Sequence, residues 1–176
     1  MQFSNNLIGY GLLAKLFHWV TFLALITQIP FGFYLVELEF SDRRIDIENI
    51  HILIGISIFY LVLFRLIWKL ISPAPKHWNE FFKGQSIIAN INHSLLYASI
   101  FAITISGILK KLYMGEKLNF FIFKYSLKES NFQLADSFYL VHIYANYLLI
   151  ALVLLHIGAV IVHHFFFKDK ILKKIL

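Results

Sequence analysis

Residues 138–167 read FYLVHIYANYLLIALVLLHIGAVIVHHFFF, a run that contains four histidines and no Asp, Glu, Lys or Arg. A stretch of this length and polarity is typical of a helix that crosses a hydrocarbon core of about 30 Å. The backbone must be helical there, because lipid offers it no other hydrogen-bond partner. About 30 residues exceed the core thickness, so the helix is expected to tilt or to project beyond it.

Three further apolar runs, at residues 16–36, 50–71 and 86–109, are also long enough to span a membrane. The first is not typical of a cleaved signal sequence, because it lacks a small-x-small cleavage site. We therefore expect an all-α membrane protein with one membrane-embedded domain over residues 1–176. Its four transmembrane helices are expected to form an up-and-down bundle.

The composition excludes a soluble enzyme. Hydrophobic residues make up 59% of the 176 positions and charged residues 15%, against about 25% charged in a soluble domain. Mean hydropathy is +0.71. The chain has no cysteine, which excludes disulfides, thiolate-bound iron–sulfur clusters and covalent c-type haem attachment.

The basic residues indicate membrane topology and no nucleic-acid binding, because they lie between and after the apolar runs. Of the 16 Lys and Arg, nine fall on the side of the two termini and seven on the other side. We therefore place both termini in the cytoplasm. The longest connection, residues 110–137, would lie outside, where its segment 120–125 (FFIFKY) is either an interfacial amphipathic piece or an ordinary loop.

Histidine is the ionisable residue that recurs within the predicted spans, and an ionisable residue in a span indicates function by default. The chain has eight histidines, of which His77 alone lies clearly in a loop. The others lie in the spans or at their ends: His18, His51, His93, His142, His156, His163 and His164.

The helix spacing separates these histidines into two levels. His142 and His156 are fourteen positions apart, which places them within about 40° of one face and about 21 Å apart along the axis. Because successive helices alternate in direction, His18 is expected at the depth of His156, and His51 at the depth of His142. The spacing thus predicts two facing pairs.

Two opposed imidazoles suit haem better than zinc. Zinc takes four protein ligands in a compact cage, whereas haem supplies four equatorial nitrogens and needs protein ligands only above and below its ring. With both axial positions filled, the chemistry would be outer-sphere electron transfer. Acidic residues fall only in loops or at span ends, which weakens the alternative of a histidine-lined metal transporter.

These residues resemble the bacterial cytochrome b561 family, small inner-membrane dihaem proteins of the four-helix type that includes superoxide oxidase. The resemblance covers nearly the whole chain and is strongest over residues 131–169. It rests on Phe17-His18-Trp19, the segment 50–55 (IHILIG), Asn92-His93, Asp136-Ser137, His142, Ala145-Asn146, His156 and the segment 163–169 (HHFFFKD).

The resemblance implies two non-covalent b-type haems, with His18, His51, His142 and His156 at the axial positions. It also implies a ubiquinone-type quinone as electron partner and, in the superoxide oxidase branch, superoxide as the donor. The localisation implied is the bacterial inner membrane. Five lysines on the outer side suit the steering of a small anion, or are simply solvated loop charges: Lys110, Lys111, Lys117, Lys124 and Lys128.

Several alternatives stay open. His163 lies on nearly the same stripe as His156 and competes with it as the inner ligand. Two other functions are an electron-transfer subunit of a larger dehydrogenase or hydrogenase, and a non-redox metal transporter. No catalytic residue and no oligomeric state is assigned. Residues that could contact a propionate, a quinone or a ligand are His93, His163, His164, Arg65, Arg43 and Lys15.

Overall fold

The structure, a computed structural model, describes residues 3–6, 9–73, 75, 83–168 and 171–176. The loop predicted around His77 lies outside these residues. Four helices have the length and composition to cross a membrane, which confirms the predicted fold class. The elements are α1 (Leu12–Glu37), α2 (Asp42–Ile71), α3 (Gln85–Tyr113), β1 (Leu118–Asn119), β2 (Lys124–Tyr125), α4 (Phe132–Val162), the π-helical turn η1 (His163–Phe167) and α5 (Ile171–Ile175).

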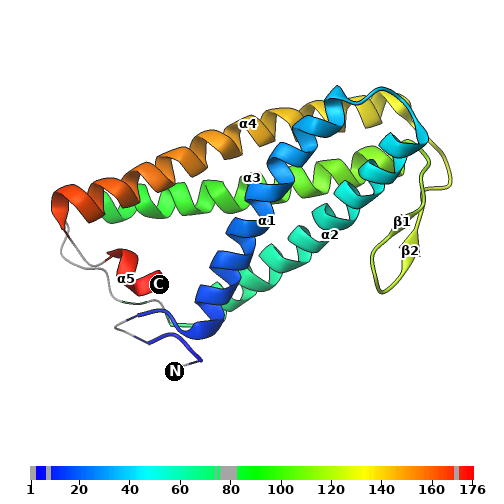
Figure 1. Cartoon of the computed structure of the whole chain (residues 1–176). Helices are drawn as coiled ribbons and strands as arrows, with labels where there is room; N and C mark the ends of the chain where they lie inside the picture. Colours follow the sequence, from blue (N-terminus) through cyan, green and yellow to red (C-terminus); the bar gives the residue numbers. More distant parts are fainter. Residues whose placement is uncertain (1–2, 7–8, 74, 76–82, 169–170) are drawn as a thin grey trace.

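The four long helices run up and down in chain order (Figure 1). Both chain termini lie at one end of the bundle, which we call the termini end. The opposite end carries the small hairpin of β1 and β2 and is called the hairpin end. Helix α3 packs along α4, α1 packs against α2, and α2 joins the two halves through α3.

The helices are longer than the apolar runs that predicted them. Helix α2 begins at Asp42 because the Ser41 hydroxyl accepts a hydrogen bond from the Arg44 N–H at 3.3 Å. Helix α4 begins at Phe132, where Asn131 accepts from the Leu134 N–H at 3.0 Å. Hydropathy indicates which part of a helix faces lipid, whereas side-chain caps decide where the helix starts.

The apolar core is small and lies where α2, α3 and α4 meet. Ile58, Val62, Ile100 and Leu149 form it, each with 6% or less of its surface exposed. Helix α1 buries only Thr21 and Gln28 among its described residues. Large apolar side chains cover much of the remaining surface, which is the polarity expected of helices surrounded by lipid.

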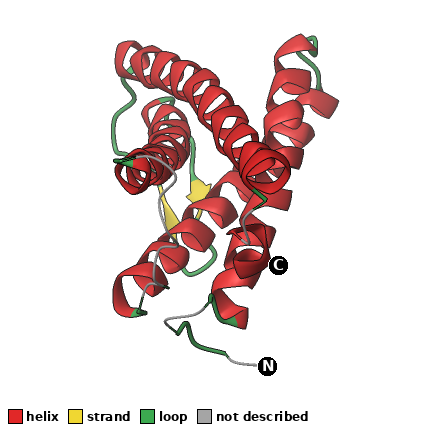
Figure 2. Cartoon of the chain, turned by 90° about the vertical axis from the view of Figure 1, so that its left-hand side faces the viewer, coloured by secondary structure: helices red, strands yellow, loops and turns green. Residues whose placement is uncertain are grey.

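The short α5 returns to the start of α1. The Lys15 ammonium donates to the Leu176 carbonyl at 2.8 Å, and the Trp19 indole donates to the Ile175 carbonyl at 3.0 Å. Figure 2 shows the two short strands of the hairpin, which follows α3 along the chain. The connection between the third and fourth helices is shorter than the predicted range 110–137, because α3 continues to Tyr113 and α4 begins at Phe132.

This extension makes Lys110 and Lys111 helical residues. Lys111 is only 6% exposed and forms ion pairs with Glu48 at 2.9 Å and with Glu116 at 2.5 Å. Lys110 lies 4.0 Å from Glu48 and stacks on the Tyr139 ring at 4.9 Å. Since a carboxylate on each side neutralises Lys111, this lysine ties α2 to the end of α3 and is not a solvated loop charge.

Replacing Lys111 by Met should therefore destabilise the hairpin end. The change leaves Glu48 and Glu116 beside each other without their shared cation, at a cost of about 1–3 kcal/mol. We expect a lower midpoint temperature in detergent micelles, measured by tryptophan fluorescence. Lys117→Met, at an exposed position, is the matched control, and equal midpoints for the two variants would contradict the role of Lys111.

Candidate functional site: two facing histidine pairs

At the termini end, His18 of α1 faces His156 of α4. Their ring centroids are 6.4 Å apart, with the ring planes inclined at 55°. His93 of α3 lies nearer, with its centroid 5.4 Å from that of His156. Three helices thus bring imidazoles together at one level.

At the hairpin end, His51 of α2 faces His142 of α4, with ring centroids 6.3 Å apart. The His142 Nδ1–H donates to the Ile103 carbonyl of α3 at 2.8 Å. Because a carbonyl oxygen can only accept, the His142 proton sits on Nδ1 and the lone pair on Nε2 is left for another group. This is the usual way in which a metal-ligating histidine is oriented.

Two glycines make room for the rings at this level. A Cβ atom added at Gly107 of α3 would lie 3.0 Å from His142 Nδ1, and one added at Gly32 of α1 would lie 3.2 Å from His51 Cε1. Both distances are tighter than ordinary van der Waals contact. The missing side chains therefore allow each imidazole to approach a neighbouring helix closely.

Gln28 holds the His51 segment from α1. Its side-chain Nε2 donates to the His51 carbonyl at 2.8 Å, a cross-helix hydrogen bond in a region without water. Among the described residues, neither Gln28 Oε1 nor His51 Nδ1 has a hydrogen-bond partner, although both atoms are buried. Buried polar atoms are normally paired, so these two are available to a bound group.

Arg65 of α2 reaches the termini-end pair. Its Nη2 donates to His18 Nδ1 at 2.9 Å, and its guanidinium lies 5.5 Å from the centre of the Tyr97 ring. The Lys69 ammonium lies 5.0 Å from the same ring. Two cations therefore share one aromatic ring beside His18. An anionic or electron-rich group would be attracted to this place.

The separation of the two rings in each pair is the one that two imidazoles would need to bind a single metal ion between them. Two imidazoles on one metal ion place their centroids about 6 Å apart, because each metal–nitrogen bond is about 2.0 Å and the centroid lies about 1.1 Å behind the nitrogen. The observed 6.4 Å and 6.3 Å agree with this value. Inclined ring planes are compatible with it, since each ring can rotate about its own metal–nitrogen bond.

The helices whose histidines face one another do not pack closely on each other. Helix α4 packs extensively on α3 but makes no comparable contact with α1 or α2 within the described chain, although its histidines face theirs. Although His18, His93 and His156 share one level, no three His, Asp or Glu side chains of the described residues are placed so that they could together hold a metal ion. The donor set therefore fits a cofactor that brings its own equatorial ligands, as haem does.

Comparison with known proteins identifies the family. The family model for prokaryotic cytochrome b561 matches residues 9–176. The chain belongs to the prokaryotic cytochrome b561 family. It is also 28% identical over 180 residues to cytochrome b561 homolog 2 of Escherichia coli strain K12, an alignment that covers 100% of this chain and 95% of the relative.

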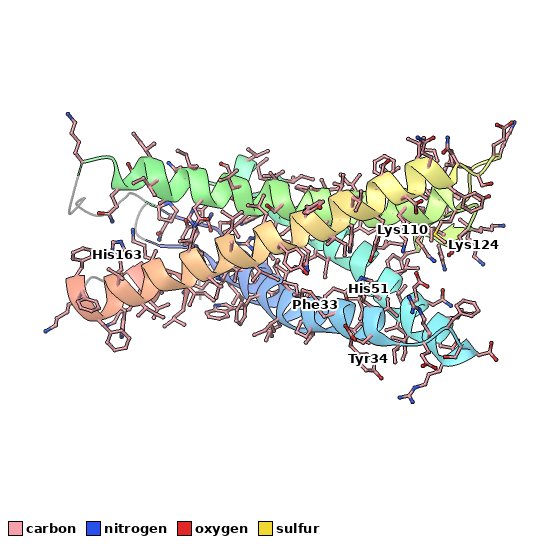
Figure 3. All side chains as sticks on the ribbon, turned by 90° about the horizontal axis from the view of Figure 1, so that it is seen from above. Phe33, Tyr34, His51, Lys110, Lys124 and His163 are labelled. Carbon is pink, nitrogen blue, oxygen red and sulfur yellow. The ribbon has the colours of Figure 1, made fainter. Side chains whose placement is uncertain are left out.

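Membership in the cytochrome b561 family implies a membrane cytochrome that transfers electrons through haem b. The four histidines predicted as ligands lie in the two pairs described above. His163 lies apart at the termini end, where it shares a 3.2 Å hydrogen bond with the Gln85 side chain (Figure 3). Figure 3 shows His51, Lys110 and Lys124 toward the opposite end.

The other predicted contact residues of this cytochrome b561 family member lie at different places. Arg65 and His93 lie within the termini-end cluster, as given above. His164 and Arg43 are exposed, and Lys15 bonds to the carbonyl of Leu176. Neither Arg43 nor His164 has a recorded side-chain contact with either histidine pair.

Sequence reasoning missed Gln28, Gly32, Gly107, Lys69 and Tyr97. Gln28 could have been found, because a glutamine inside an apolar span needs a partner. The glycines carry no comparable signal, since glycine is common in membrane helices for many reasons. Their role depends on which helix face meets a histidine, and that is a property of the packed bundle.

Gly107→Val should displace His142 and reduce haem content. The new side chain would occupy the space of the His142 ring and break its hydrogen bond to Ile103, so we expect the haem that His142 would hold to be lost, measured by a pyridine haemochrome assay. Gly158→Val is the control, because nothing lies within 4 Å of a Cβ added at Gly158. Full haem content in Gly107→Val would contradict the role of Gly107 in making room for His142.

Proposed function

We propose that this protein is a dihaem b-type cytochrome that carries single electrons across the membrane, from a donor at the hairpin end to a quinone. The observation that carries this proposal is the presence of two facing histidine pairs at two depths. His142 and His156 lie about 21 Å apart along α4. Two cofactors at these levels would connect the two membrane faces.

His51 with His142 and His18 with His156 are the proposed axial ligands. The spacing of each pair supports this choice. His93 lies only 5.4 Å from His156, less than two axial ligands of one metal require, so we assign it a supporting position. His163 is supported less well than His156, because its recorded polar partner is Gln85 and its ring packs on Phe167.

Bound haem supplies one-electron chemistry with no open iron position when both axial ligands are histidines. The protein's own residues orient those ligands. Ile103 holds His142 with Nε2 unprotonated, and Gln28 fixes the backbone of His51. His18 accepts a hydrogen bond from Arg65 on Nδ1, so a neutral His18 ring carries its proton on Nε2. For Nε2 to bind iron, this proton would have to move to Nδ1, and Arg65 would have to donate to another acceptor. Haem propionates are such acceptors.

Superoxide is the proposed donor and a ubiquinone-type quinone the proposed acceptor. Two superoxide anions would each lose one electron and become dioxygen, while the quinone takes up two electrons and two protons to become a quinol. Exposed Lys117, Lys124 and Lys128 at the hairpin end would attract a small anion. Lys111 contributes less than the sequence suggested, because two carboxylates neutralise it.

The proposed location is the bacterial inner membrane, with the termini end in the cytoplasm and the hairpin end outside, as the distribution of basic residues favours. A second candidate is an electron-transfer subunit of a larger dehydrogenase or hydrogenase. It would keep the same haems. Family membership favours either redox function over metal transport.

Substitution of single histidines tests the ligand assignment. We expect two low-spin b haems per purified chain, and each of His142→Ala and His156→Ala should remove or alter one, because each loses an axial ligand. Reduced-minus-oxidised spectra and the pyridine haemochrome assay measure this. His163→Ala is the matched control, and loss of a haem there with retention in His156→Ala would reverse the inner assignment. A colourless protein after expression with ample haem would contradict the whole proposal.

Arg65→Gln should lower the reduction potential of the haem at the termini end. Reduction removes one positive charge from the iron, so repulsion from a nearby cation is smaller in the reduced form and the cation raises the reduction potential. Removing the Arg65 charge is expected to lower the potential by on the order of 60 mV, a tenfold change in the one-electron equilibrium. Optical redox titration measures it. Arg65→Lys should retain most of the potential, Arg43→Gln should leave it unchanged, and an unshifted potential in Arg65→Gln would argue against the effect.

A further inference from the structure

The turn of the hairpin is apolar at every position. Its four residues, 120–123, read FFIF, whereas turns that face water use Gly, Asn, Asp, Ser and Pro. Phe121 has φ at 68°, in the left-handed region that bulky residues rarely adopt. A phenylalanine at such a position carries backbone strain that a glycine would not.

The hairpin folds back along α2. The Tyr60 hydroxyl donates to the Phe120 carbonyl at 3.4 Å, and the Tyr60 and Phe121 ring centroids are 6.4 Å apart. Tyr60 lies nine positions beyond His51, about 13 Å further along α2 toward the termini end. The turn therefore lies beside a membrane-spanning helix and not beyond its end (Figure 1).

Half of the polar backbone groups at the turn have a recorded hydrogen-bond partner within the protein. The Phe120 N–H donates to the Phe123 carbonyl at 2.8 Å, and the Phe121 N–H donates to Asn119 Oδ1 at 3.1 Å. The strands pair Leu118 with Tyr125 and Asn119 with Lys124. Internal pairing of this kind is what allows a backbone segment to leave water.

Three side chains of the turn remain largely exposed, although the Phe121 ring also packs on Tyr60. Ile122 is 84% exposed, and Phe121 and Phe123 are each more than half exposed. Lys117 and Lys124, both exposed, flank the apolar residues. Amphipathic segments that lie at the boundary of lipid headgroups and acyl chains have this arrangement of apolar residues with basic neighbours.

We propose that the hairpin turn inserts into the lipid leaflet at the hairpin end, with Phe121, Ile122 and Phe123 among the acyl chains. Lys117 precedes β1 and Lys124 begins β2, so their long side chains would reach from the hairpin toward the phosphate headgroups, whose charge they complement. The occupant of this surface is lipid, because the turn continues the lipid-facing surface of α2 at the depth of Tyr60. The proposal does not depend on the bound cofactor.

Site-directed fluorescence tests it directly, because the chain has no native cysteine. Ile122→Cys and Phe123→Cys are labelled separately with an environment-sensitive dye, and Lys128→Cys is the matched control on the same connection. The haem-loaded protein is placed in nanodiscs that hold one chain each. Quenching is compared between aqueous iodide and lipids that carry a nitroxide near the top of the acyl chain.

We expect the lipid nitroxide to quench the labels at 122 and 123. We expect iodide to quench these two labels at least several-fold less than it quenches the label at 128. Iodide quenching equal to that at 128 would overturn the proposal and indicate a water-facing surface. Protection only in densely packed proteoliposomes, and not in single-chain nanodiscs, would overturn it in favour of contact with a second copy of the chain.

Discussion

An imidazole inside a membrane has lost the water that would otherwise hydrogen bond to both of its nitrogens. The arrangement of this bundle follows from how the nitrogens of four such rings find other partners. His142 donates to a backbone carbonyl of α3, and His18 accepts from Arg65 of α2. His51 keeps a buried nitrogen without a partner among the described residues. Each unsatisfied or shared nitrogen is costly in hydrocarbon. The rings face one another, and the proposed haem iron would supply the missing partner.

This requirement explains why the bundle is packed unevenly. Helix α3 lies close along α4, and α1 along α2, whereas α4 has little backbone contact with the helices whose histidines it faces. Glycines at 32 and 107 bring neighbouring helices close to the rings. The small core at Ile58, Val62, Ile100 and Leu149 holds the helices together between the two histidine levels.

The two levels differ in their electrostatics. At the hairpin end, the nearby lysines Lys110 and Lys111 contact the carboxylate of Glu48, so the local charge is largely balanced. At the termini end, Arg65 and Lys69 share the Tyr97 ring, and the described residues supply no carboxylate to either. In the proposed dihaem protein, this difference favours the electron at the termini end and gives transfer a direction.

Hydropathy alone predicted four spanning helices, and it predicted the ends at Glu37 and Ile71 to within a residue, because exclusion from water acts on each segment separately. The starts of α2 and α4 were missed, since Ser41 and Asn131 extend those helices beyond the apolar runs.

Helical spacing also predicted which histidines share a level. Only the tertiary structure decided that Arg65 reaches His18, that Gln28 bonds to the His51 segment and that the hairpin turns back to Tyr60. Those contacts depend on the rotation and tilt of each helix against its neighbours, which packing sets and which no single segment of sequence encodes.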